Sequence, residues 1–175
     1  AFQVVSIART RGFLTSSYSN WPLFVPILLL LTAFIGACAG STGGGIKVIR
    51  TLILAKQSAG EITKLIHPNA VISIKLGKKA ISPRIAESVW GFFSIYVIVF
   101  IILFMFLLAQ GNDFITSFSA VGATLNNLGP GLGDVANNYQ SLNDYSKIGL
   151  SIAMILGRLE IFTLLVLFTP AFWKK

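Results

Sequence analysis

Two glycine-containing turns are the parts of this sequence whose residues could do chemistry, and that chemistry is the binding of a dehydrated cation. A cation without its water shell needs several oxygen atoms directed at one axis, which successive backbone carbonyl groups can supply. Glycine permits such a turn because it tolerates positive φ and lets backbones approach closely. Gly12 and Gly129 stand in turns of this kind. An ordinary external turn also favours Gly and Pro, so the local residues leave both interpretations open.

A third glycine-rich segment, GSTGGGIK at 40–47, has the glycine spacing of a phosphate-binding loop. Ile46 separates the last glycine from Lys47, no Ser or Thr follows the lysine, and an apolar span rather than a β-strand precedes the segment. Nucleotide binding is therefore disfavoured. A small, flexible, hydroxyl-bearing segment instead suits a gate that blocks a cavity or swings aside. The gate predicted from these residues lies within 40–45, and the family resemblance given below implies that it comprises Ala39, Gly40, Ser41, Thr42, Gly43, Gly44 and Gly45.

Arg158 is a charge inside the apolar segment from Ser146 to Phe172. A charge at such a depth costs at least about 2–3 kcal/mol unless it faces water or a partner. An ion pair with Glu160 is the alternative, but residues two apart point to different faces of a helix. We therefore expect Arg158 to face a pore as an electropositive barrier, and Glu160 to partner another helix.

The composition places the elements that carry these residues in a lipid bilayer. Of the 175 residues, 54% are hydrophobic and only 11% are charged. The segment from Val89 to Ala109 holds no charge, and as a helix it would be roughly 31 Å long, which matches the bilayer core. The sequence thus predicts an all-α membrane protein. The single cysteine, Cys38, excludes an internal disulfide. The sequence opens without Met in mid-pattern, so we expect it to be a piece of a longer protein.

The net charge of +8 is unevenly distributed along the chain, and this predicts topology rather than nucleic-acid binding. The segment 110–145 contains no Lys or Arg. By the positive-inside rule the basic loop 47–87 is cytoplasmic, and so is the C-terminus with its Trp173-Lys174-Lys175 anchor, whereas 110–145 lies outside. Eight of the 14 basic residues fall in the predicted cytoplasmic loop: Lys47, Arg50, Lys56, Lys64, Lys75, Lys78, Lys79 and Arg84.

The first apolar segment has the pattern of a membrane helix that is broken near mid-depth. An apolar run from Trp21 to Gly36 leads into the small residues at 37–45, and a second helical stretch follows. Each glycine of the GGG run costs a helix about 1 kcal/mol relative to Ala. Non-helical backbone at that depth survives only when it is buried in protein or lines a water-filled cavity, so the break marks an ion or solute path. Alternating residues at 71–79 predict a short hairpin in the loop that follows.

The second half of the chain predicts a re-entrant loop between two spans. Residues 113–124 form an amphiphilic helix too short to span, with Asp113 as the expected N-cap, and the run ends in LNNLGPGLGD. The order of segments repeats: FQVVSIARTRGF, a span and FIG correspond to FSAVGATLNNLG, a span and ILG. If Phe2 is matched to Phe118, the alignment needs a one-residue gap before Gly12 and Gly129. A repeated helix–pore-loop–helix unit is how a pore is built around an axis.

Four sequence blocks together resemble the Trk/Ktr/HKT superfamily of cation transporters, and within it the TrkH-type potassium uptake proteins most closely. The likeness covers essentially the whole chain. It implies a potassium-channel-like architecture of four helix–pore-loop–helix repeats, of which this chain would hold the third pore loop onward. The four blocks are GACAGSTGGGIKVIR (36–50), LIHPNAV with IKLG (65–77), TLNNLGPGLG (124–133) and ILGRLEIF (155–162).

The resemblance implies a role for each segment. Residues 1–20 would end the third pore helix and form its filter loop, 21–64 the broken helix with the gating loop at 37–45, 65–87 a cytoplasmic loop, and 88–175 the fourth repeat. Arg158 would face the pore beneath the filter. The filter would be formed by Thr10, Arg11, Gly12, Asn126, Asn127, Leu128 and Gly129. Potassium, the one expected cofactor, would bind the backbone carbonyl groups of Thr10, Arg11, Asn127 and Leu128.

The expected activity is gated potassium uptake across the cell inner membrane, without enzymatic chemistry. The resemblance implies the remaining pore repeats, a homodimer and a cytoplasmic nucleotide-binding regulatory subunit as partners. A sodium-selective or sodium-coupled relative is the nearest alternative, because the filter loops of the first two repeats are absent. A broken-helix secondary transporter for an organic solute is a second alternative, although the spans offer such a solute little besides Arg158 and Glu160. A non-conducting membrane assembly is the third.

Overall fold

The structure is a computed structural model that describes residues 2–13, 21–22, 24–36, 44–68, 74–77, 79–159 and 173. Most of these residues are helical and only four are in strands, which confirms the all-α class. Of the predicted residues, the gating positions 39–43, Glu160 and the end of the final span lie outside the described residues. The elements in chain order are α1 (Phe2–Ala8), α2 (Phe24–Ile35), α3 (Val48–Ile66), β1 (Lys75–Leu76), β2 (Lys79–Ala80), α4 (Pro83–Ala109), α5 (Phe114–Leu125), the 3-10 turn η1 (Gly133–Val135) and α6 (Asp144–Arg158).

Helix α4 is long and apolar enough to cross a bilayer, being 27 residues and therefore about 40 Å long. It begins at Pro83, six residues before the charge-free run, because proline suits the first turn of a helix, where a backbone N–H has no partner to lose. Helix α3 continues to Ile66. The connection between the two helices is therefore 67–82, shorter than the loop 65–87 that the sequence suggested.

The first apolar segment is interrupted between α2 and α3. Gly36 and Gly45 both have positive φ, 70° and 86°, where the chain leaves and rejoins the two helices. The Ile46 amide donates to the carbonyl oxygen of Phe34 at 3.0 Å, which closes the base of the intervening segment. This hydrogen bond therefore holds the end of α2 close to the residues that lead into α3.

The connection between α3 and α4 contains the predicted hairpin. Strands β1 and β2 pair antiparallel, with Lys75 opposite Ala80 and Leu76 opposite Lys79, which confirms the prediction. Ile74 and Leu76 pack against the buried cluster between α3 and α4, so the hairpin is fixed to the two helices rather than free in solvent.

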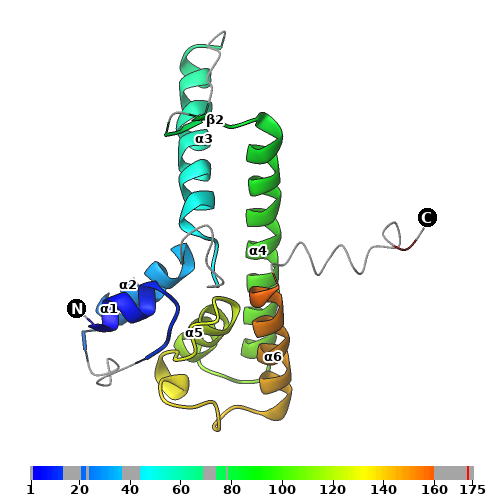
Figure 1. Ribbon diagram of the computed structural model, residues 1–175. Coiled ribbons are helices and arrows are strands. Elements are labelled where there is room, and N and C mark those ends of the chain that lie inside the picture. Colours follow the sequence, from blue (N-terminus) through cyan, green and yellow to red (C-terminus); the bar gives the residue numbers. More distant parts are fainter. Residues whose placement is uncertain are drawn as a thin grey trace.

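Helix α5 begins at the same end of the molecule at which α4 ends and α6 begins. Asp113 caps α5 by accepting a hydrogen bond from the Ile115 amide at 3.1 Å, which confirms the predicted N-cap. Asn112, just after α4, donates to Ser146 at the start of α6 at 3.3 Å. The end of α4 and the start of α6 are thus adjacent, and Figure 1 shows α5 packed beside them, at the end opposite the hairpin.

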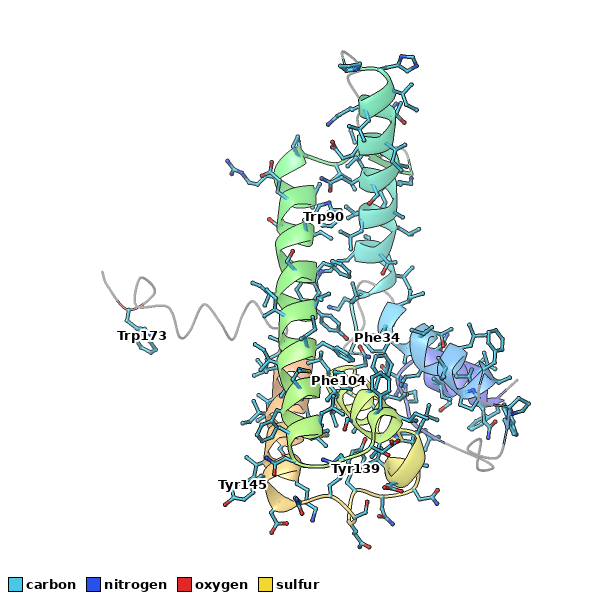
Figure 2. The ribbon with its side chains drawn as sticks, turned by 180° about the vertical axis from the view of Figure 1, so that it is seen from behind. Phe34, Trp90, Phe104, Tyr139, Tyr145 and Trp173 are labelled. Atoms are coloured by element: carbon cyan, nitrogen blue, oxygen red, sulfur yellow. The ribbon has the colours of Figure 1, made fainter. Side chains whose placement is uncertain are left out.

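Aromatic side chains join the broken helix to the second half of the chain. The ring of Phe34 lies 5.6 Å from Phe100 of α4 and 6.4 Å from Phe118 of α5. Phe104 extends the same group, and Figure 2 shows Phe34 and Phe104 at the junction of α2, α4 and α5. Stacked and edge-to-face aromatic pairs add to the burial of apolar area. This cluster holds α5 against both spans.

The final span begins two residues earlier than expected. The sequence suggested a helix from Ser146 to Phe172, and α6 is a helix from Asp144 to Arg158 with Leu159 as its C-cap; the rest of the expected span lies outside the described residues. Arg158 is therefore the last helical residue of α6, and an exposed one.

Candidate functional site: two paired re-entrant turns

The two predicted filter turns have the same backbone conformation, 117 residues apart. Helix α1 ends at Ala8 and α5 at Leu125. Thr10 and Asn127 both adopt positive φ, 51° and 53°, which is uncommon for residues other than glycine. Gly12 and Gly129 follow two residues later with φ of 72° and 100°.

The hydrogen bonds of the two turns also correspond. In the first turn the Thr10 amide donates to Ile7 O and the Arg11 amide to Ser6 O, at 2.9 and 2.8 Å. In the second turn the Asn127 amide donates to Thr124 O at 3.0 Å, and the Leu128 amide to Ala123 O at 2.7 Å. Each of these positions differs by 117 residues between the turns. The sequence repeat is thus a repeat of structure down to individual backbone hydrogen bonds.

This register corrects the sequence alignment of the repeats. Matching Phe2 to Phe118 required a one-residue gap, whereas the constant offset of 117 needs none and pairs Phe2 with Ser119. The alignment was wrong because it matched like side chains. The repeat is carried by the backbone of the turn, which places few demands on the residues of the preceding helix.

The two turns lie against each other. A methyl group on Gly12 would overlap the carbonyl oxygen of Leu128 and would lie 3.1 Å from the Pro130 ring. The Leu128 side chain is 4% exposed and packs in one cluster with Ile7 of α1. The tertiary structure therefore brings the predicted residues 10–12 and 126–129 together at one place.

Asn126 fixes the start of the second turn. Its side chain is fully buried, donates from Nδ2 to Gly122 O at 2.7 Å and accepts at Oδ1 from the Tyr96 hydroxyl of α4 at 2.8 Å. A buried amide needs such partners, because an unsatisfied polar group in an apolar environment is costly. The turn is in this way tied to the spanning helix.

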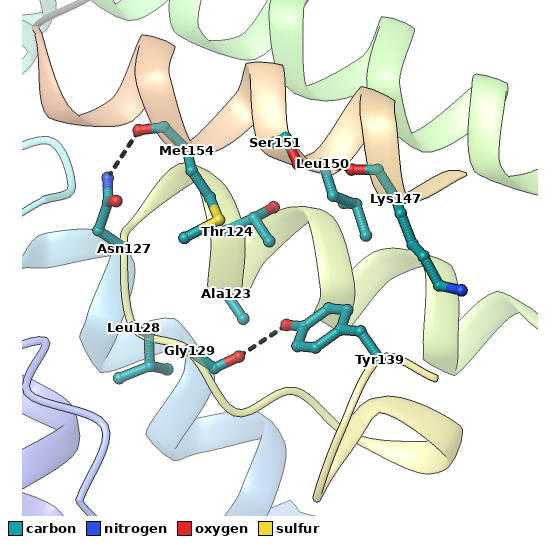
Figure 3. Close-up of a pocket in the computed structure, with 10 residues that line it drawn as sticks. All are labelled: Ala123, Thr124, Asn127, Leu128, Gly129, Tyr139, Lys147, Leu150, Ser151 and Met154. Atoms are coloured by element: carbon teal, nitrogen blue, oxygen red, sulfur yellow. Dashed lines mark hydrogen bonds between the residues drawn. The ribbon is translucent and has the colours of Figure 1, made fainter. Parts of the chain in front are cut away.

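The next residues of the turn are held by α6 and by the loop between η1 and α6. Asn127 Nδ2 donates to Met154 O of α6 at 3.2 Å, and Tyr139 Oη donates to Gly129 O at 2.6 Å. Between these two contacts lies a cavity of about 320 Å³ whose wall includes Thr124, Asn127 and Leu150 (Figure 3).

The described part of the predicted gating segment lies directly against the second turn. Gly44 is buried, and a methyl group on it would overlap the backbone oxygen of Asn126. A methyl group on Gly45 would lie 3.3 Å from Asn126 Oδ1. The break in the first span and the second turn are therefore in backbone contact.

The two arginines of the predicted site are exposed, as is Gly129 of the second turn. Arg11 follows the first turn's Thr10, and Arg158 closes α6 four residues after Met154, whose carbonyl oxygen binds Asn127. Arg158 is thus near the second turn along α6.

Sequence reasoning missed two side chains that hold the turns. Tyr96 lies within an apolar span, where a hydroxyl group needs a buried partner; this requirement was a usable signal. Tyr139 lies in a polar loop with no distinguishing pattern around it, and only the tertiary structure brings it to Gly129.

Replacing Tyr96 with Phe should lower the free energy of unfolding by about 1–3 kcal/mol, because the buried Asn126 oxygen loses this donor. Thermal unfolding of the detergent-solubilised protein measures the effect. Tyr145→Phe is the matched control, because Tyr145 is 72% exposed. An unchanged melting temperature in Tyr96→Phe would show that the hydrogen bond does not stabilise the fold.

The helical fold, with one helix long and apolar enough to cross a bilayer, agrees with a family of cation transport proteins. The sequence model of the family TrkH, described as "Cation transport protein", matches residues 1–175. The chain belongs to this family.

Its relatives are potassium uptake proteins. The chain is 60% identical over 174 residues to the Trk system potassium uptake protein TrkH of Escherichia coli (strain K12), and 44% identical to the TrkG protein of the same strain. Each match covers 99% of this chain but 36% of the relative, so the chain spans about a third of their length. The crystal structure of the potassium transporter TrkH from Vibrio parahaemolyticus superposes with a TM-score of 0.90 at 55% identity, over 99% of this chain and 37% of that one.

Proposed function

We propose that the protein containing this chain takes up potassium through a gated, channel-like pore, and that the two paired turns are part of its filter. The repeated backbone carries this proposal: two turns 117 residues apart share φ values and hydrogen bonds, and meet at Gly12 and Leu128. A filter assembled from repeats needs equivalent carbonyl groups around one axis. The ion ligands would be the backbone carbonyl groups of Thr10, Arg11, Asn127 and Leu128.

Potassium is the proposed ion because the relatives with 44–60% identity are named potassium uptake proteins. A sodium-selective pore is the alternative that the experiment must exclude. Both ions bind carbonyl oxygens, but they differ in the ion-to-oxygen distances that they require.

The gate proposed here is the segment from Ala39 to Gly45, together with Arg158. The contact of Gly44 with the backbone of Asn126 supports it, because a segment in that position lies directly beside the proposed ion path. Arg158, on the helix that binds Asn127, would add a positive charge that opposes cation passage.

The proposed topology is multi-pass in the inner membrane, with the turns toward the outside. The hairpin, the basic connection between α3 and α4, and the C-terminus would be cytoplasmic. In this arrangement 1–20 ends the third pore unit and 88–175 forms the fourth, as the repeated turns support. The remaining pore repeats, a second protomer and a cytoplasmic nucleotide-binding subunit are the proposed partners.

Uptake into liposomes tests the function. The full-length polypeptide that carries this sequence is reconstituted, and uptake of rubidium, a potassium substitute, is compared with uptake of sodium. Rubidium uptake well above that of protein-free liposomes, with little sodium uptake, is expected. Sodium uptake equal to or above rubidium uptake would overturn the potassium assignment, and absence of both would overturn the pore.

A further inference from the structure

The Tyr139 hydroxyl binds a backbone oxygen of the second filter turn. Tyr139 Oη donates to Gly129 O at 2.6 Å, a distance at the short end for a hydrogen bond between two oxygens. Tyr139 lies between η1 and α6, outside the turn itself. Figure 3 shows its ring beside the cavity, with the hydroxyl directed at Gly129.

The position of the Tyr139 hydroxyl is set by the core rather than by the turn. The ring packs against the buried cluster formed by α4, α5 and α6, which includes Leu107, Val121 and Leu150, all at most 3% exposed. Tyr139 itself is half-buried, and its contact with this cluster limits the rotamers open to the ring and therefore the positions of its hydroxyl. Through this hydrogen bond, the conformation of the turn depends on how the helices pack.

Gly129 differs from the three residues before it in how it is held. Asn126 and Asn127 are fixed through side-chain amides, and Leu128 through its buried side chain. Gly129 has no side chain, is exposed, and has open space around its Cα on the side where a Cβ would stand. A glycine in that setting can rotate about φ and ψ at little cost, which would also move the Leu128 carbonyl group that precedes it.

We propose that Tyr139 is a positioning residue for ion selectivity: its hydroxyl fixes the conformation of Gly129, and thereby the direction of the neighbouring Leu128 carbonyl group. The inference rests on the proposed function, because Leu128 is one of the proposed potassium ligands. Discrimination between potassium and sodium depends on how carbonyl oxygens are presented to the ion. Releasing Gly129 should therefore affect selectivity more than the rate of permeation.

Tyr139→Phe tests this, because it keeps the packed ring and removes only the hydroxyl. In liposomes containing the full-length protein, the ratio of rubidium to sodium uptake should fall about three- to tenfold, as expected for loss of one hydrogen bond. Rubidium uptake itself should stay within about twofold of wild type, because the other carbonyl groups continue to coordinate the ion. Tyr145→Phe, an exposed tyrosine of the same region, is the matched control and should leave the ratio unchanged.

Thermal unfolding distinguishes a role of Tyr139 in positioning Gly129 from a purely structural contact. A lower melting temperature with an unchanged uptake ratio would overturn the inference, because Tyr139 would then be only a structural contact. An unchanged ratio with an unchanged melting temperature would overturn it equally. If wild-type protein takes up neither ion, the proposed function itself fails, whereas a selective wild type with an equally selective Tyr139→Phe variant refutes this inference alone.

Discussion

Gly12→Ala should reduce potassium uptake at least about tenfold, because it disturbs the contact between the two turns. The left-handed φ of 72° costs a residue with a Cβ roughly 1–2 kcal/mol of backbone strain. A second effect adds to this strain. The new methyl group would overlap the carbonyl oxygen of Leu128, so one turn must move away from the other. Because the two turns contribute carbonyl groups to the same proposed filter, a displacement of either one removes ligands from the ion. Rubidium uptake into liposomes is the measurement.

Gly77→Ala is the matched control for this variant. Gly77 also has positive φ, 62°, but nothing lies within 4 Å of an added methyl group, and it stands in the hairpin at the opposite end of the molecule. Gly77→Ala should therefore carry a similar backbone strain but leave potassium uptake at the wild-type level. Wild-type uptake by Gly12→Ala would contradict the pairing of the two turns as a filter.

Deleting Gly43 to Gly45 should increase uptake severalfold, because the deletion removes the backbone that lies against Asn126. The base of the segment is closed by the hydrogen bond from Ile46 to Phe34 and bordered by the positive φ of Gly36. A segment shortened by three residues cannot keep the hydrogen bond from Ile46 to Phe34 and also contact Asn126. The increase should appear for rubidium with the ratio of rubidium to sodium uptake preserved.

The uptake ratio serves as the control for this second prediction. A rise in both ions with loss of selectivity would mean that the filter was damaged and no gate was opened. Unchanged or lower uptake in a protein that elutes and melts as wild type does would contradict the gate. Arg158→Ala should act in the same direction as the deletion if the arginine opposes cation passage.

The sequence alone was sufficient for features that depend on local chemistry. The charge-free run in α4, the Asp113 cap of α5, the hairpin around Gly77 and the break after Gly36 all follow from residues close together in the chain. The length of an apolar run, capping groups and turn residues act over a few neighbouring positions, so they can be predicted from the sequence alone.

Helix boundaries were predicted less accurately because competing local preferences decide them. Helix α4 begins at Pro83 rather than after the charged residues, since Arg84 and Glu87 are tolerated in an exposed first turn. The one-residue gap between the repeats was wrong for a related reason: side-chain likeness misled where backbone conformation carries the repeat.

Only the tertiary structure decided which residues act on the turns. That Gly12 meets Leu128, that Gly44 lies against Asn126, and that Tyr139 binds Gly129 are contacts between segments up to 116 residues apart. No local pattern encodes them, because each depends on how α4, α5 and α6 pack. The sequence determined that this chain lies in a membrane and carries two glycine turns; helix packing determined that the turns face each other and are held in place.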